Sequence, residues 1–354
     1  MQAMPGLKTQ LFRTGLSALW FSGVARVLSR VTAGKGAILM LHRVQPATNA
    51  AFDPNAALSI TPEYLEALVQ SFRAAHIDIV SLDEAQRRIT TSGHTRRFVC
   101  FTFDDGYRDN LEHALPVFQR YSAPFTVYVT TSFTLRSFAP WWDVLAAAIA
   151  KSERVRWVDS AGERNLDVTT TDAKYRAYDE LAAEFFRLPV EQMRAQVARL
   201  SAEHELPIAE FAARETCNVS ELRALQAGGA EIGCHTVSHP VLRRETPETV
   251  RNEMARARET LEAALGSTVR HLAYPYGKPD HVGAREFAIA RELGFATATT
   301  TRKGALFSAH AQHLQALPRV EVTPSFSSSP RYVQTIVSGL PLWAWNRGRL
   351  AVVS

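Results

Sequence analysis

The chain has 354 residues, of which 46% are hydrophobic and 21% are charged. This length fits about two average domains or one large α/β barrel with an insertion, and the composition excludes disordered, collagen-like and mucin-like proteins. The 40 Lys and Arg residues exceed the 35 Asp and Glu residues by five and form no long basic runs. We therefore expect no nucleic-acid partner, whereas the charge is compatible with an anionic membrane surface.

The three cysteines, Cys100, Cys217 and Cys234, have no short spacing between them. Their odd number also argues against a disulfide framework or a cysteine-based zinc site. Cys100 and Cys234 lie within apolar runs. We therefore expect buried thiols in a reducing compartment, which indicates a cytoplasmic protein.

Residues 1–34 predict an amphipathic helix and not a membrane span. Between Leu11 and Val31 three arginines bracket an uncharged core, which is shorter than the ~20 apolar residues needed to cross a bilayer of ~30 Å. Trp20 and Phe21 suit an interfacial position on the cytoplasmic membrane, and packing on the protein itself is the alternative. Secretion is less favoured, because no clean small-x-small cleavage site follows.

The main body, residues 35–330, alternates short apolar runs with amphipathic helical patterns. One such helix, Pro247–Leu265, is preceded by the cap residue Thr246 and ended by Gly266. Continuous apolar runs are typical of parallel strands covered on both faces. About seven repeats predict a closed or nearly closed α/β barrel. The runs lie at residues 37–41, 98–103, 124–130, 230–234, 271–274, 295–299 and 317–322.

Two segments fall outside this alternation. Residues 141–216 are rich in Ala, Glu, Arg and Leu with helical spacing, and they predict a helical insertion in the barrel. Residues 331–354 form a C-terminal tail in which Trp343 and Trp345 stand beside arginines, as in the N-terminal segment. The oligomeric state is left open by the sequence.

Polar residues follow several of the predicted strands, at the end where such barrels carry their reacting groups. Asp104 and Asp105 come directly after a buried run. Because neighbouring side chains diverge, one carboxylate can bind a cation while the other stays free. The alternative is ordinary turn or helix-cap chemistry, which an Asp-Asp-Gly sequence also serves.

His235 and His239 follow another predicted strand and are four residues apart. Two imidazoles at this spacing can converge on one metal ion, although a pair of surface histidines at a turn is the alternative. Together with one carboxylate they make a three-ligand set that leaves a position open for water. The second carboxylate of the Asp104–Asp105 pair would then be a general base.

These motifs resemble those of the NodB-homology polysaccharide deacetylases, carbohydrate esterase family 4. The resemblance is carried, in chain order, by Phe101–Gly106, by His235-x-x-x-His239 and by Tyr274–Gly277, and it extends over about residues 35–322. It implies a distorted, incomplete (β/α) barrel with fewer than eight regular strands. The implied activity is the removal of N- or O-acetyl groups from sugars.

The resemblance also implies a role for each matching residue. Asp104 would be the general base, and Asp105, His235 and His239 would bind a divalent metal ion, most simply Zn²⁺. The backbone N–H of Tyr276 would help to stabilise the oxyanion of the transition state.

The sequence departs from the family pattern at two points. Ala273 replaces the usual arginine of the third motif, and no late histidine follows the last strand. A subgroup that resembles the poly-N-acetylglucosamine deacetylases instead starts with a strand ending in histidine, and His42 occupies that position. By this resemblance His42 is the candidate general acid, and Arg319 would orient Asp104. The alternatives are a core histidine for His42 and a surface ion pair for Arg319.

We therefore expect a metal-dependent hydrolase that deacetylates a carbohydrate, such as a polysaccharide or oligosaccharide containing N-acetylglucosamine. A first alternative is a deacetylase of a lipid-linked N-acetylhexosamine at the cytoplasmic membrane. A second alternative is a barrel that binds carbohydrate without catalysis.

Overall fold

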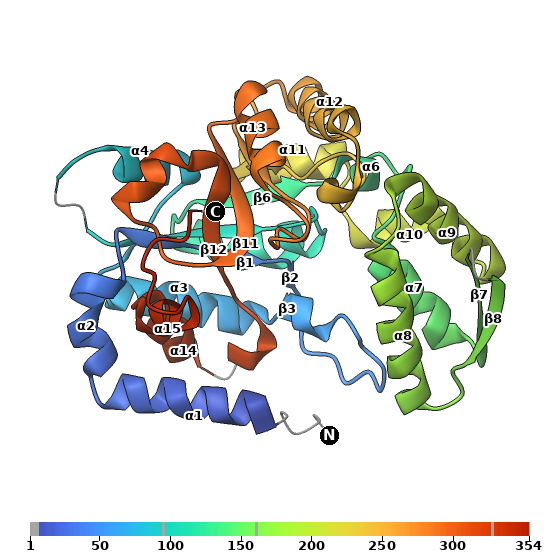
Figure 1. Ribbon diagram of the computed structural model, residues 1–354, viewed down its shortest axis with the longest axis horizontal. Helices are drawn as coiled ribbons and strands as arrows, with labels where there is room; N and C mark the ends of the chain where they lie inside the picture. The colour runs from blue at the N-terminus through green and yellow to red at the C-terminus, as the bar shows by residue number, and fades with distance from the viewer. Residues whose placement is uncertain (1–6, 94–95, 160–161, 327–328, 354) are drawn as a thin grey trace.

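The computed structural model describes residues 7–93, 96–159, 162–326 and 329–353 (Figure 1). Seven parallel strands form a ring in the order β1-β12-β11-β10-β9-β6-β5, and β5 pairs with β1 to close it. The predicted α/β barrel is therefore confirmed, with seven strands in its ring. These strands are β1 (Gly36–Leu41), β5 (Phe98–Phe103), β6 (Phe125–Val129), β9 (Ala230–Cys234), β10 (His271–Ala273), β11 (Thr297–Lys303) and β12 (Leu317–Glu321).

The closing pair of strands is buried along its whole length. β1 and β5 run in register from Gly36 opposite Phe98 to Leu41 opposite Phe103. A Cβ atom on Gly36 would lie 2.3 Å from the Phe98 carbonyl oxygen, so only glycine permits this close approach. A short extra strand, β4 (Asp78–Ile79), pairs with the start of β5 outside the ring.

Amphipathic helices surround the ring (Figure 1). In α12 the side chain of Thr246 accepts a hydrogen bond from the Thr249 N–H, and Gly266 ends the helix with φ 67°, as its sequence predicts. The surrounding helices are α3 (Pro62–Ala74), α4 (Leu82–Thr90), α5 (Leu115–Arg120), α11 (Val219–Ala227), α12 (Pro247–Leu265) and α13 (Ala284–Glu292).

The segment 141–216 projects from the barrel as a lobe with a hydrophobic core of its own (Figure 1). The segment is mostly helical, but β7 and β8 form an antiparallel hairpin that the expectation of a helical insertion did not include. Residues 154–157 alternate exposed and buried, and Val155 and Trp157 point into the lobe's core. This period of two specifies a strand. The lobe comprises α7 (Trp141–Lys151), β7 (Arg154–Asp159), β8 (Gly162–Asp167), α8 (Thr171–Phe185), α9 (Val190–Glu203) and α10 (Ile208–Glu215).

The two ends of the described chain pack against each other beside α3 (Figure 1). The expected N-terminal helix is broken in two, because Gly23 adopts φ 72° between α1 and α2. Arg13 Nε donates to the Ser325 carbonyl at 2.7 Å, and Thr32 Oγ1 donates to the Ser338 carbonyl at 2.7 Å. The terminal helices are α1 (Leu7–Phe21), α2 (Val24–Thr32), α14 (Pro330–Val337) and α15 (Leu340–Trp345). Among the described helices, none has the length and apolar character required to cross a bilayer.

Candidate active site

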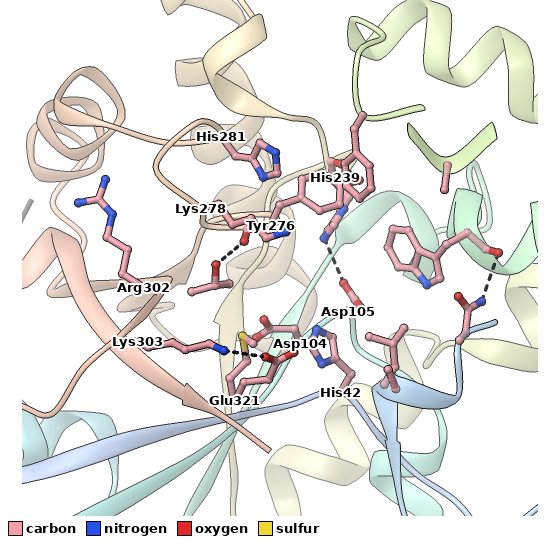
Figure 2. Close-up of a pocket in the computed structure, with 18 of the residues that line it drawn as sticks. His42, Asp104, Asp105, His239, Tyr276, Lys278, His281, Arg302, Lys303 and Glu321 are labelled. Carbon is pink, nitrogen blue, oxygen red and sulfur yellow. Dashed lines mark hydrogen bonds and ion pairs between the residues drawn. The ribbon is translucent and has the colours of Figure 1, made fainter. Parts of the chain in front are cut away.

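A cavity of about 1020 Å³ opens at the carboxyl ends of the barrel strands (Figure 2). Six of the seven predicted site residues line it. Arg319 does not line the cavity: it is buried within β12 and lies behind Asp104. The six lining residues come from the segments after β1, β5, β9 and β10, and they are His42, Asp104, Asp105, His235, His239 and Tyr276.

The three predicted metal ligands converge on one point. Asp105 Oδ1 lies 3.5 Å from His235 Nε2 and 3.3 Å from His239 Nε2, and all three side chains are buried. Figure 2 shows Asp105 and His239 pointing toward each other across the cavity. Donor atoms bound at about 2.0–2.2 Å to a tetrahedral zinc ion lie roughly 3.4 Å apart. The spacing of these atoms therefore fits a divalent ion.

The unpartnered oxygen of Asp105 and the protonation state of His235 also fit a bound cation. The Oδ1 atom of Asp105 is buried and has no hydrogen-bond partner among the described residues. His235 Nδ1 lies 2.7 Å from the Ala273 carbonyl, so that nitrogen carries the proton and Nε2 presents a lone pair to the cluster. Burial lowers the pKa of His235 to about 4, and the imidazole is therefore neutral at neutral pH.

Asp104 stays free of this cluster and is held by Arg319. Two parallel hydrogen bonds of 2.7 Å join the guanidinium to the two carboxylate oxygens, and both side chains are buried. Burial alone would raise the pKa of Asp104, but the charge of Arg319 outweighs it and the pKa lies well below its usual range. Arg319 Nε also donates to the Thr300 carbonyl at 3.0 Å, which holds the guanidinium against the Asp104 carboxylate.

The backbone is strained at the site. Asp105, Thr236, His239 and Tyr276 all have positive φ, between 56° and 74°. They are four of nine such non-glycine residues in the described ranges. Left-handed backbone of this kind costs about 1–3 kcal/mol per residue and persists where surrounding contacts impose it. The contacts around the site therefore hold these four residues in strained conformations, at a cost in stability.

Glu253 of α12 supplies one of those contacts, and no sequence motif indicates this role. Its Oε2 accepts hydrogen bonds from the backbone N–H groups of Val237 and Ser238, at 2.9 and 2.8 Å. Arg194 of α9 donates to Ser238 Oγ at 2.9 Å. The loop between the two histidines is therefore fixed from the barrel on one side and from the lobe on the other.

The lobe also builds an aromatic wall of the cavity, which the sequence reasoning missed. Trp141 Nε1 donates to the Tyr276 hydroxyl at 2.7 Å, and the Tyr276 ring packs edge-on against His239 with centroids 4.6 Å apart. Trp142 packs on His239 in the same way at 4.9 Å, and Phe186 contacts Tyr276. The two adjacent tryptophans at the start of the insertion are the sequence feature that could have indicated this wall. The Tyr276 backbone N–H makes no hydrogen bond within the described ranges.

A second group of potential ligands lies near the amino ends of the strands and does not line the cavity. His271 Nε2 is 3.2 Å from Asp83 and 3.1 Å from Glu231. Arg270 Nε lies 2.9 Å from the same Asp83 oxygen. These carboxylates already have cationic or imidazole partners, so the cluster around Asp105 is the better candidate metal centre.

Comparison with known proteins agrees with this geometry. A model of the polysaccharide deacetylase family matches residues 91–158 and 170–298, which together exceed half of the chain. The chain therefore belongs to the polysaccharide deacetylase family, as its motifs predict. It is accordingly a hydrolase acting on carbon–nitrogen bonds, of the carbohydrate deacetylase class. A search of curated proteins found no match.

Solved structures share the fold at low sequence identity. The Streptococcus pyogenes deacetylase PplD, in complex with acetate, is 19% identical with a TM-score of 0.57, covering 85% of this chain and 97% of that one. IcaB from Ammonifex degensii is 18% identical with a TM-score of 0.53, covering 86% and 97%. The polysaccharide deacetylase BC0361 from Bacillus cereus is 16% identical with a TM-score of 0.52, covering 85% and 69%.

Proposed function

We propose that the protein is a metal-dependent N-deacetylase of an N-acetylglucosamine-containing polysaccharide or oligosaccharide. One observation carries this proposal: an ionised carboxylate, Asp104, lies in the same cavity as a buried Asp–His–His cluster whose spacing suits a divalent ion. Hydrolysis of an amide needs a base beside an electrophilic centre, and these two features provide them.

Asp105, His235 and His239 would hold the ion, and Zn²⁺ is the simplest occupant for this donor set. When bound, such an ion would polarise the acetyl carbonyl and make a nearby water more acidic. The ligand set leaves the remaining coordination positions to water and substrate.

The other site residues would transfer protons and stabilise the developing negative charge. Asp104 accepts a proton from the attacking water, and Arg319 keeps Asp104 ionised and oriented. The Tyr276 backbone N–H donates to the oxygen on which negative charge develops. His42 then protonates the departing nitrogen, because an amide anion is too poor a leaving group. The products are acetate and a free amine.

The shape of the cavity supports a substrate with more than one sugar ring. Its volume of about 1020 Å³ lies at the upper end of the range of roughly 300–1,000 Å³ for small-molecule sites. Trp141, Trp142 and Phe186 line one side, and such rings offer apolar faces to sugars. Acidic and basic groups line the other side, where Lys303 lies 4.0 Å from Glu321.

The experiment is a measurement of acetate release from chitooligosaccharides, poly-N-acetylglucosamine, acetylated xylan and lipid-linked N-acetylhexosamine. We expect release from an N-acetylated glycan, loss of release with a chelator and recovery on adding Zn²⁺. Acetate release from none of the four would refute the deacetylase proposal. Carbohydrate binding that persists without any acetate release would support the non-catalytic barrel.

A lipid-linked N-acetylhexosamine is the second candidate substrate, and a neighbouring groove favours it. This groove of about 300 Å³ lies between α1 and α15. It shares Lys303, Glu321 and Trp345 with the large cavity. A sugar in the cavity could thus have an apolar chain leaving along the groove. In the substrate panel, a preference for the lipid-linked compound over free oligosaccharides would select this candidate.

A further inference from the structure

The helices at the two ends of the chain form an exposed apolar surface, which we call the terminal face. It comprises α1, α2 and α15, which pack together beside the barrel (Figure 1). Of the twelve large hydrophobic side chains that are exposed in the described ranges, ten lie on these helices. They are Leu11, Phe12, Trp20, Phe21, Val24, Val27, Leu28, Val31, Trp343 and Trp345. A surface of this kind marks an interaction site.

The helix α2 turns its apolar side toward solvent, whereas an ordinary surface helix turns its apolar side toward the protein. It turns its small and polar residues, Ala25, Ser29 and Thr32, toward the protein and exposes its four larger aliphatic residues. Val27 is 69% exposed and Val31 is 65% exposed. A helix that served only to cover the barrel would bury this stripe, so the apolar side of α2 is built for contact with something else.

The charge of the terminal segments has one sign. Residues 1–34 and 322–354 contain seven of the 40 Lys and Arg residues and none of the 35 Asp and Glu residues. These segments therefore carry a charge of +7, whereas the rest of the chain carries −2. Arginine is interleaved with the apolar residues, as where the Arg331 guanidinium lies 5.2 Å from the Phe21 ring centre. Apolar and basic residues without acids are the combination that binds anionic lipid surfaces.

We propose that the terminal face binds the surface of an anionic lipid bilayer. The aromatic and aliphatic side chains would enter the boundary between headgroups and acyl chains, and the arginines would contact lipid phosphates. A second copy of the chain fits less well, because a symmetric contact would bring this positive surface against itself. The described helices do not span a membrane, so the chain would lie on the bilayer.

This attachment would place the cavity close to the membrane. Trp345 of α15 is 65% exposed, and it lines both the cavity and the adjoining groove. If the proposed deacetylase function holds, the cavity would meet acetylated glycans that are attached to membrane lipids. Bilayer binding itself does not depend on that function, and it can be tested separately.

The test is flotation of the full-length protein with vesicles of phosphatidylcholine alone or with added phosphatidylglycerol. We expect binding to the anionic vesicles, and weaker binding at high salt. The double variant Arg26→Gln/Arg30→Gln should lower the partition coefficient by about tenfold or more, given ~1 kcal/mol per basic residue at such a surface. The double variant Val27→Ser/Val31→Ser should also lower it, because it removes apolar side chains that would enter the bilayer boundary. All four positions are exposed, so these changes leave the core intact.

Matched controls remove the same kinds of side chain from elsewhere. Leu135→Ser/Tyr175→Ser changes the two exposed large hydrophobic residues outside the face, and Arg176→Gln/Arg256→Gln changes two exposed arginines on other helices. These controls should bind vesicles as the unaltered protein does. Equal binding by face and control variants, or no binding to anionic vesicles, would overturn the proposal. So would a dimer in sedimentation equilibrium that the face variants dissociate. Acetate release, measured in parallel, reports on the catalytic proposal alone.

Discussion

Arg319 and Asp104 are joined by two parallel hydrogen bonds of 2.7 Å, although 215 residues separate them in the chain. The family pattern places an arginine in the third motif, where this chain has Ala273. Here the guanidinium comes from inside β12 and approaches the carboxylate from within the barrel. A buried ion pair of this geometry fixes both the ionisation and the orientation of the Asp104 carboxylate.

Arg319→Lys should therefore impair the proposed general base, Asp104, while keeping a positive charge nearby. An ammonium cannot form the bidentate contact, and we expect kcat to fall by about 100-fold, as for a misplaced catalytic group. Because Arg319 lowers the pKa of Asp104, its loss should raise that pKa. The acidic limb of the kcat/KM profile should then move to higher pH. An unchanged profile with full activity would remove Arg319 from this role.

Substitutions at Asp104 and at His235 should distinguish a residue needed for catalysis from a residue needed for metal binding. Asp104→Asn should reduce acetate release by at least ~10²-fold, since a general base typically contributes 10²–10⁴-fold, yet the purified protein should retain its metal. His235→Ala should lose both the metal and the activity. Metal content by elemental analysis, set beside acetate release, checks the pair. An active Asp104→Asn protein, or one without metal, would contradict the assignment.

Asp143 should make stability depend on pH. It is buried behind the aromatic wall, where Tyr107 Oη donates to it at 3.0 Å and Asn55 Nδ2 at 2.8 Å. Burial raises its pKa to about 7, whereas an unfolded chain has a value near 3.9. Between pH 4 and pH 7 the Asp143 carboxyl is therefore protonated in the folded state and ionised in the unfolded state. The contribution of this group to the free energy of unfolding falls as the pH rises through that range.

Asp143→Asn should remove this loss. Relative to the unaltered protein, the variant should gain up to about 3 kcal/mol of stability between pH 5 and pH 8, because roughly two pH units separate pH 5 from the folded pKa of about 7. Urea unfolding at the two pH values measures the difference, and the exposed Asp172→Asn provides the control. A variant whose relative stability does not change with pH would refute a raised pKa at Asp143.

The barrel strands could be predicted because each is a continuous apolar run, and a parallel sheet covered on both faces requires such runs. The residues directly after them could be predicted as the site, because strand ends meet at one end of a barrel. His42, Asp104 and His235 were found in this way, and all three line the cavity. Their placement follows from local pattern and fold class together.

Contacts between distant elements could not be predicted from local patterns in the sequence. The pairing of Arg319 with Asp104 was expected from the family resemblance alone, because no local pattern indicates that a residue inside β12 reaches that carboxylate. Nothing in the local sequence around Glu253 indicates that it holds a loop 15 residues away. The β7–β8 hairpin was missed because the helical composition of the lobe outweighed a short alternating stretch.

Glu253 offers a test of how far such a distant contact controls the site. Glu253→Ala would leave the buried N–H groups of Val237 and Ser238 without an acceptor, at a cost of about 1–3 kcal/mol each. The loop carrying His235 and His239 should relax, and metal affinity should fall by about tenfold or more, as for other supporting contacts of metal ligands. Glu253→Gln keeps one acceptor oxygen, so it should restore most of the affinity. A competitive chelator titration measures the metal affinities of the unaltered protein and of the two variants. Equal affinities for the two variants would show that the loop holds its shape without Glu253.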